Sequence, residues 1–339
     1  MTRRPIRVQG SGRPLLDIFS AGRAGTQSRL HFSRAQIEQI ARTVRRTPEV
    51  MVKVTGGGAS SGAVSAHFGY ISRHGELEIE TDEGERIPKE EQKEFLEDWH
   101  LELTAGQYRA GRDGKQEMRK VKLVHKIVLS MPAPTPPEKV LAAARTFARE
   151  RFGAQHRYAM VLHTDQPHPH VHMVVKAEGE DGRRLHVDKE MLREWREDFA
   201  RMMREQGVAA NATPRVARGR NKGSTKDPIY RAQRHGASTA LRDTVASVVK
   251  ELKETGTVRD PGRKRLVETR KAVVGSWMRT ADVLDQQGEV SLAGDVRYFA
   301  KHLPPVLTER ERIAVGILGH VDRRRAIDKV REAQSDPTR

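Results

Sequence analysis

Hydrophobic and polar residues alternate most clearly between residues 120 and 176, and this stretch predicts three β-strands. Residues 120–131 form one long alternating run, which ends at a group of prolines: Pro132, Pro134, Pro136 and Pro137. Residues 157–163 and 171–176 predict two more strands, joined by a turn over residues 165–169. Since this pair is a hairpin, a single antiparallel sheet fits better than a doubly wound parallel sheet.

Apolar residues at helical spacing predict helices on both sides of these strands. The expected helices cover residues 33–46, with Ser33 as N-cap, and residues 59–74, 88–103, 138–152 and 187–206. A short apolar run at residues 50–54 predicts another strand, and the triplet Gly56-Gly57-Gly58 that follows predicts a turn. Strands and helices therefore interleave in an α+β domain.

Charge divides the chain into four parts. Lys and Arg number 62 against 45 Asp and Glu, a formal net charge of +17 that favours a polyanionic partner. We expect a basic N-terminal arm with a short helix at residues 1–46, a compact domain at 47–206, a basic linker at 207–236 and a small helical domain at 237–339. The linker carries seven Lys or Arg and one Asp.

The composition also excludes several kinds of chemistry. Without cysteine the chain has no disulfide, no thiolate nucleophile and no cysteine-ligated metal. No apolar run reaches the ~18–20 residues of a membrane span, and the N-terminus lacks the apolar segment of a signal peptide. We expect a soluble cytoplasmic protein with no membrane insertion.

Four histidines fall within ten residues around the expected hairpin. His170 and His172 lie two apart on a strand, so both rings leave the same face, about 6.6 Å apart. A six-residue turn would place His163 opposite His170, with Cβ atoms ~4.5–5.5 Å apart. Three imidazoles on one face are typical of a site for a divalent cation with open coordination positions. Asp165 would either orient a ligand histidine or cap the turn. His168 would be an accessory group or would contact substrate.

Tyr70 is the candidate nucleophile. Val64, Phe68 and Ile71 form the apolar stripe of the helix over residues 59–74, and Tyr70 lies about 120° from the centre of that stripe. A tyrosine in this position has two interpretations. It is either a group activated for phosphoryl chemistry or a helix-flank ring that packs on a neighbour.

Two stretches resemble motifs of the plasmid relaxase and mobilisation nuclease family, within the HUH endonuclease superfamily. The run from His163 to His172, His-Thr-Asp-x-x-His-Pro-His-Val-His, is similar to motif III, particularly in the subfamily with the T-DNA border endonuclease. Residues 68–79, FGYISRHGELEI, look like motif I with Tyr70 in the nucleophile's position. The resemblance covers about residues 49–220 and leaves out the first 46 residues and the C-terminal helices.

The resemblance implies a five-stranded antiparallel sheet with packed helices and a strand-specific DNA transesterase. Tyr70 would attack single-stranded DNA at a transfer origin and form a 5′-phosphotyrosyl adduct, and the strand would later be rejoined. A metal on His163, His170 and His172, expected to be Mg²⁺ or Mn²⁺ with Zn²⁺ as a candidate, would assist, with Asp165 as a further catalytic residue. DNA contacts are expected from these residues: Arg73, His168, Arg215, Arg218, Arg220 and Lys222.

The same resemblance implies partners and a cellular route. An accessory origin-binding protein and the coupling protein of a type IV secretion system are candidate partners, and the protein would leave the cell covalently attached to DNA during conjugation. A replication initiator would share the chemistry, but the absence of a tyrosine pair in motif I favours plasmid mobilisation.

Two other classes of function stay open. His168-Pro-His170-Val-His172 also satisfies the alternating pattern of histidine-triad nucleotide hydrolases, in which a histidine is the nucleophile. The second alternative is a non-enzymatic basic DNA-binding protein in which the histidines hold a structural metal. Covalent attachment to DNA separates both from the relaxase.

Overall fold

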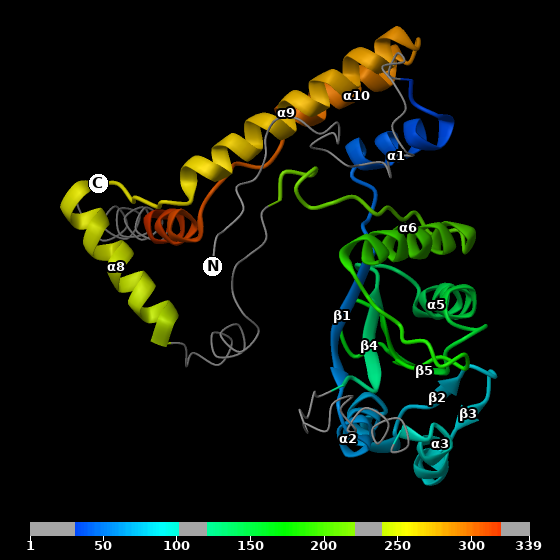
Figure 1. The fold of residues 1–339 in the computed structure, drawn as a ribbon. Helices are drawn as coiled ribbons and strands as arrows, with labels where there is room; N and C mark the ends of the chain where they lie inside the picture. Colours follow the sequence, from blue (N-terminus) through cyan, green and yellow to red (C-terminus); the bar gives the residue numbers. More distant parts are fainter. Residues whose placement is uncertain (1–30, 102–120, 221–238, 320–339) are drawn as a thin grey trace, which may run out of the picture. The chain divides into compact units, whose positions relative to one another are not determined.

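The computed structural model describes residues 31–101, 121–220 and 239–319, and the chain divides into two units (Figure 1). One unit is Arg45–Ala212, which carries the sheet and the histidine cluster. The other combines the described parts of Met1–Val44 and Thr213–Arg339. None of the helices in the described ranges is long and apolar enough to cross a membrane.

The first unit is built on one six-stranded antiparallel sheet. The strands are β1 (Met51–Gly58), β2 (Ile79–Thr81), β3 (Arg86–Ile87), β4 (Val124–Ser130), β5 (Tyr158–His163) and β6 (His170–Lys176). Their order across the sheet is β1-β4-β6-β5-β2-β3. The expected antiparallel α+β architecture is therefore confirmed, and the hairpin of β5 and β6 lies near the middle of the sheet.

Alternate residues of the strands build a separate core on each face of the sheet. Helices α5 (Pro137–Arg151) and α6 (Lys189–Glu205) cover one face, where Met173 and Val175 of β6 meet Phe147 and Trp195. Helix α2 (Ser61–Ile71) packs on the other face, where Val174 joins a cluster with α2 and α3 (Gln92–Asp98). Because side chains alternate along β6, the histidines at 170 and 172 belong to the face that α2 covers.

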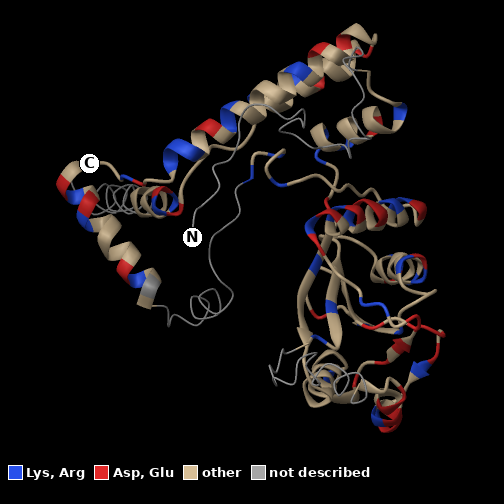
Figure 2. Cartoon of the chain, in the orientation of Figure 1, with Lys and Arg blue, Asp and Glu red and all other residues tan. Residues whose placement is uncertain are grey.

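The expected number of five strands is wrong, because β2 and β3 form a hairpin that adds a sixth strand at the edge. Its strands have only three and two residues and lie in a strongly acidic stretch, visible in Figure 2, so no alternation marked them. Gly84, with φ +82°, makes the turn between them. The expected helix over 88–103 is a 3-10 turn, η2 (Lys89–Glu91), followed by the short α3, and residues 102 and 103 lie outside the described part.

The glycine triplet is not the predicted turn, because all three glycines belong to β1. A Cβ on Gly57 would lie 2.6 Å from the carbonyl oxygen of Val124 on β4, and a Cβ on Gly58 would lie 2.5 Å from Cγ2 of Val64 on α2. Glycine at these positions lets β1 approach β4 and α2 closely. The triplet therefore serves packing, while Ser60 is the N-cap of α2, its hydroxyl accepting from the Ala63 amide.

The second unit is helical in the described residues. It contains α1 (Arg34–Val44), α8 (Thr239–Thr255), α9 (Arg263–Gln286) and α10 (Val290–Lys301). Ile40 and Val44 of α1 share a buried cluster with Trp277 of α9 and Phe299 of α10. The short helix of the expected N-terminal arm thus packs with the C-terminal helices, and residues 221–236 of the expected linker lie outside the described part.

Candidate functional site

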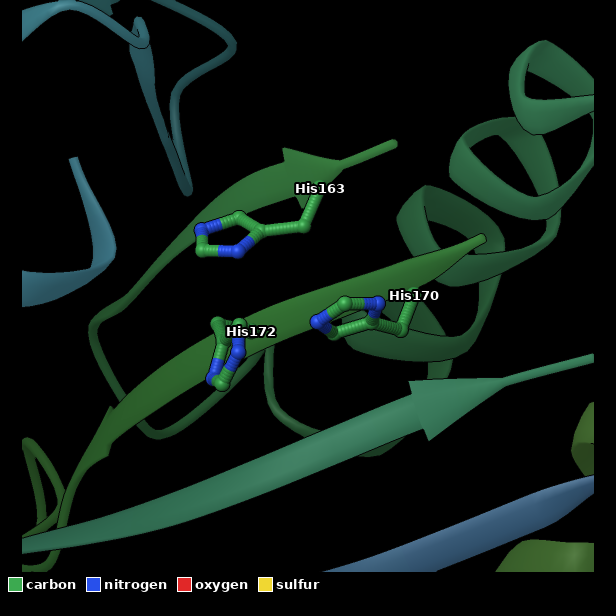
Figure 3. Close-up of side chains that lie close together, drawn as sticks. All are labelled: His163, His170 and His172. Carbon is green, nitrogen blue, oxygen red and sulfur yellow. The ribbon is translucent and has the colours of Figure 1, made fainter. Parts of the chain in front are cut away.

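Three histidines meet on the α2 face of the sheet, at the end of the β5–β6 hairpin. His163 pairs directly with His170 across the two strands, which confirms the register predicted from the six-residue connection. The ring centroids of His163 and His172 are 4.6 Å apart, and each lies 5.1 Å from that of His170. Figure 3 shows the three imidazoles facing one common space, and one nitrogen from each lies within 4.8 Å of the others.

The protonation of His163 follows from its partner on α2. Its Nε2 lies 2.6 Å from the carbonyl oxygen of Ile71, and a carbonyl can only accept a hydrogen bond. Nε2 therefore carries the proton, which leaves the lone pair on Nδ1 available as a ligand. Burial is the largest cause that lowers the pKa of His163. The neutral form that a metal requires is thus favoured.

The other two histidines also have a ring nitrogen that could bind a metal. His170 donates from Nδ1 to the carbonyl oxygen of His168 at 3.0 Å, so its lone pair lies on Nε2. Burial, followed by the neighbouring His163 and His170, lowers the pKa of His172 to about 3. A neutral imidazole at this position remains a ligand well below the ordinary pKa of histidine.

These three residues fit a divalent cation. A metal binds imidazole nitrogen at about 2.0–2.1 Å, so small ring rotations bring nitrogens within 4.8 Å of one another onto a single ion. Three nitrogen ligands leave further coordination positions for oxygen atoms of a substrate. The set contains no sulfur, so it suits several divalent metals.

Tyr70 lies beside this cluster, on the last turn of α2. Its side chain is 57% exposed, and its ring centroid is 6.4 Å from that of His172. His67, one turn earlier, stacks on Tyr70 at 6.2 Å and contacts the His172 ring edge-on at 6.5 Å. The geometry thus brings the predicted nucleophile next to the predicted ligands. His67 was not among the predicted site residues, although its position three before Tyr70 on a helix places both on one side.

A sharp change of backbone direction after α2 brings Arg73 into the site. Arg73 and His74 have φ values of 53° and 58°, in the left-handed region that ordinary residues rarely adopt. The Arg73 guanidinium lies 2.5 Å from Oδ2 of Asp165, 3.4 Å from Nδ1 of His163 and 5.8 Å from the centroid of the Tyr70 ring. Backbone strain of this kind concentrates at functional sites.

Asp165 lies in the connection between β5 and β6 and forms its ion pair with Arg73. Its Oδ1 is 3.8 Å from Nδ1 of His163, whereas the proton on Nε2 of His163 goes to the backbone of Ile71. Asp165 is therefore connected to the ligand histidine through Arg73. The sequence alone does not show that Arg73 contacts both Asp165 and His163, because these contacts depend on the left-handed backbone at Arg73 and His74.

The remaining predicted residues are placed as follows. His168 is exposed in the same connection, and its Nδ1 accepts from the amide of Ala133 at 3.3 Å. Arg215 and Arg220 are exposed and Arg218 is half-buried, all in the helical unit, and Lys222 lies outside the described residues.

Comparisons with known proteins agree with this geometry. Residues 75–208 match the family described as "Relaxase: MobA/VirD2-like, nuclease domain". A stretch of 137 residues is 26% identical to the T-DNA border endonuclease VirD2 of Rhizobium radiobacter and 28% identical to those of Rhizobium rhizogenes and Agrobacterium fabrum. Each alignment covers 38% of this chain and 30% or 31% of the relative, so the chain spans about a third of these proteins.

Residues 75–208 are thus similar to the nuclease domain of MobA/VirD2-like relaxases, as the resemblance in the sequence indicated. This matched stretch contains β5 and β6 with His163, His170 and His172. The family match begins at Gly75, five residues after Tyr70. The matched residues therefore do not include Tyr70.

Proposed function

We propose that the protein nicks one strand of DNA at a transfer origin and becomes covalently attached to it. The phenolic oxygen of Tyr70 attacks the scissile phosphorus and displaces the 3′-oxygen of the preceding nucleotide. One O–P bond forms and one breaks, and the proton lost by the phenol is balanced by the proton gained at the 3′-oxygen. Since a phosphodiester is exchanged for another, the strand can be rejoined by the reverse step.

The observation that carries this proposal is the exposed tyrosine beside the cluster of three histidines. Tyr70 is open to a large substrate, and its ring lies 6.4 Å from that of His172. A nucleophile and its electrostatic support must lie within reach of the same reacting atom. The histidine-triad hydrolase and the structural-metal protein explain neither this tyrosine nor the relaxase match.

The histidines are proposed to hold the divalent ion through Nδ1 of His163, Nε2 of His170 and one ring nitrogen of His172. When bound, such an ion withdraws charge from the non-bridging oxygens of a phosphate. Mg²⁺ or Mn²⁺ is the expected ion. The chain itself fixes the tautomers of His163 and His170 through the carbonyls of Ile71 and His168.

The rest of the chain is proposed to bind and deliver the DNA. Arg73 and His168 near the histidines, and Arg215, Arg218, Arg220 and Lys222 after the nuclease domain, would contact phosphates. Such contacts should weaken steeply as salt rises. Mobilisation of a plasmid, an accessory origin-binding protein and a secretion coupling protein belong to the same proposal.

The proposal is tested by following covalent attachment on a denaturing gel. Labelled single-stranded oligonucleotides, tiled across the DNA flanking the gene, are incubated with the full chain and Mn²⁺. We expect one tile to give a labelled band at protein mass that disappears with a chelator and with Tyr70→Phe. Tyr298→Phe is the matched control, because Tyr298 is also exposed but lies on α10 of the helical unit.

Three results would count against the proposal. An adduct that persists in Tyr70→Phe would exclude this tyrosine as the nucleophile. Tight DNA binding without an adduct on any tile would favour a non-enzymatic DNA-binding protein. Hydrolysis of a nucleoside phosphoramidate by the same preparation would favour the histidine-triad enzyme.

A further inference from the structure

A cleft of about 520 Å³ lies directly beyond the histidine cluster, between the β4–α5 connection and the β5–β6 connection. Five prolines form most of its walls: Pro134, Pro136, Pro137, Pro167 and Pro169. The volume falls within the range of sites that bind small organic groups. Neither the metal site nor the attack by Tyr70 uses this cleft.

The cleft is rigid because its two walls are tied together. The amide of Ala133 donates to Nδ1 of His168 at 3.3 Å, and the amide of Met131 donates to the carbonyl oxygen of Pro169 at 3.3 Å. The hydroxyl of Ser130 donates to the same carbonyl oxygen at 3.2 Å. The proline rings also fix the backbone φ angles at the prolines that line the cleft. A ligand that binds in such a cleft therefore causes little further loss of conformational entropy in the walls.

The lining matches a flat, uncharged group. No lining residue carries a charge, and the proline rings offer apolar surfaces without N–H groups. The polar side chains are Thr135, Thr164 and Gln166. Among the described residues, nothing hydrogen-bonds the side chains of Thr164 and Gln166, so both can bond to a ligand. A nucleobase has apolar faces and a polar edge, whereas a phosphate would find no cation in this lining.

The position of the cleft decides which base it receives. Thr164 directly follows His163, and Pro169 directly precedes His170, so the cleft adjoins these two histidines. Tyr70 approaches from the other side, next to His172 and His67. In phosphoryl transfer the attacking and leaving oxygens lie roughly in line on opposite sides of phosphorus. An oxygen that leaves on the side away from Tyr70 would lie toward His163 and His170, the two histidines that the cleft adjoins.

We propose that this cleft binds the base of the nucleotide immediately 5′ of the nick, the nucleotide that ends in the free 3′-hydroxyl. This rests on the nicking reaction proposed above and adds a specificity site to it. The cleft would hold the released strand in place until rejoining. Thr164 and Gln166 would read the base edge, and the proline rings would pack on its faces.

The test uses the nicked oligonucleotide and a copy with an abasic site at that nucleotide. In the wild-type protein, loss of the base should slow adduct formation about tenfold, since its contacts with the cleft are lost. Gln166→Ala and the cleft-filling Ala133→Leu should slow cleavage of the normal oligonucleotide and lose most of this sensitivity to the missing base. Gln155→Ala, an exposed glutamine at the other end of β5, is the matched control and should retain it.

Rejoining gives a second measurement. The isolated adduct is supplied with a 3′-hydroxyl oligonucleotide, and its KM should rise about tenfold in Gln166→Ala and in Ala133→Leu, but not in Gln155→Ala. The proposal is overturned if the abasic site slows the wild type and both cleft variants equally, or slows none of them. Failure of the wild-type protein to form any adduct would instead contradict the nicking function itself.

Discussion

Arg73 places a positive charge at the atom of His163 that is available to a metal. Its guanidinium lies 3.4 Å from Nδ1 of His163, and within the described part of the chain its ion pair is with Asp165. A bound cation and this guanidinium repel each other. We therefore predict that Arg73→Gln binds Mn²⁺ about two- to fivefold more tightly in a calorimetric titration, given the modest energies of partly exposed charge pairs.

The control for this prediction is Arg86→Gln, which removes an equally basic residue that pairs with Glu78 on the β2–β3 hairpin. It should leave Mn²⁺ affinity unchanged. Weaker binding in Arg73→Gln would show that the arginine supports the ligands rather than opposing the ion.

His67 makes the stability of the metal-free protein depend on pH. Burial, with a smaller effect from Lys126, lowers its pKa to about 4 in the folded chain, against about 6.5 for a free histidine. Between these values the unfolded chain binds the proton more strongly. The contribution of His67 is therefore complete above pH 6.5 and is lost as the pH falls toward 4. His172, with a pKa of about 3, acts in the same direction.

We predict that the urea midpoint, measured with a chelator present, falls between pH 7 and pH 5, and falls less in His67→Gln. Both proteins are compared at each pH, so that loss of packing in the variant appears as a constant offset. An identical pH dependence in the two proteins would contradict this prediction. It would show that the His67 ring binds a proton as strongly in the folded chain as in the unfolded chain.

At the scale of elements, contact between β1 and α2 depends on a missing side chain at Gly58. A Cβ there would lie 2.5 Å from Cγ2 of Val64, which is fully buried. We predict that Gly58→Ala lowers the free energy of unfolding by about 1–3 kcal/mol, the usual cost of overpacking. Gly62→Ala, four residues further on, adds a methyl group with nothing within 4 Å and should be neutral or stabilising by up to about 1 kcal/mol. Urea denaturation of both variants measures the difference, and equal effects would contradict the packing argument.

The sequence predicted the central hairpin well because its pattern is local. The alternation of His170 and His172, with a six-residue connection from His163, was enough to place three rings on one face. Arg73 was different, since its contact with Asp165 needs two residues in the left-handed region. The proton on Nε2 of His163 goes to a backbone carbonyl, and backbone partners leave no mark in side-chain patterns. The glycine triplet was misread because glycine marks a turn and a close strand contact alike.

At the scale of the whole molecule, the sequence suggested consecutive parts, whereas the structure joins segments far apart in the chain. Helix α1 packs with α10, more than two hundred residues later, and Trp277 of α9 donates to the carbonyl oxygen of Ala217. Composition alone could not reveal this, because α1 lies within a basic stretch that resembles a flexible arm. The helical unit is thus completed by residues on both sides of the nuclease domain.

This arrangement predicts that a substitution near the N-terminus loosens helices near the C-terminus. Ile40 is fully buried on α1 among residues of α9 and α10. Ile40→Ala should destabilise this unit by about 2–5 kcal/mol through the cavity it leaves. Hydrogen exchange should then accelerate in α9 and α10 and stay unchanged in β4, β5 and β6. Ile127→Ala, in the core under the sheet, should give the reverse pattern. If Ile40→Ala instead accelerated exchange in the sheet, α1 would belong to the nuclease domain, and the catalytic face would depend on the N-terminal residues for its stability.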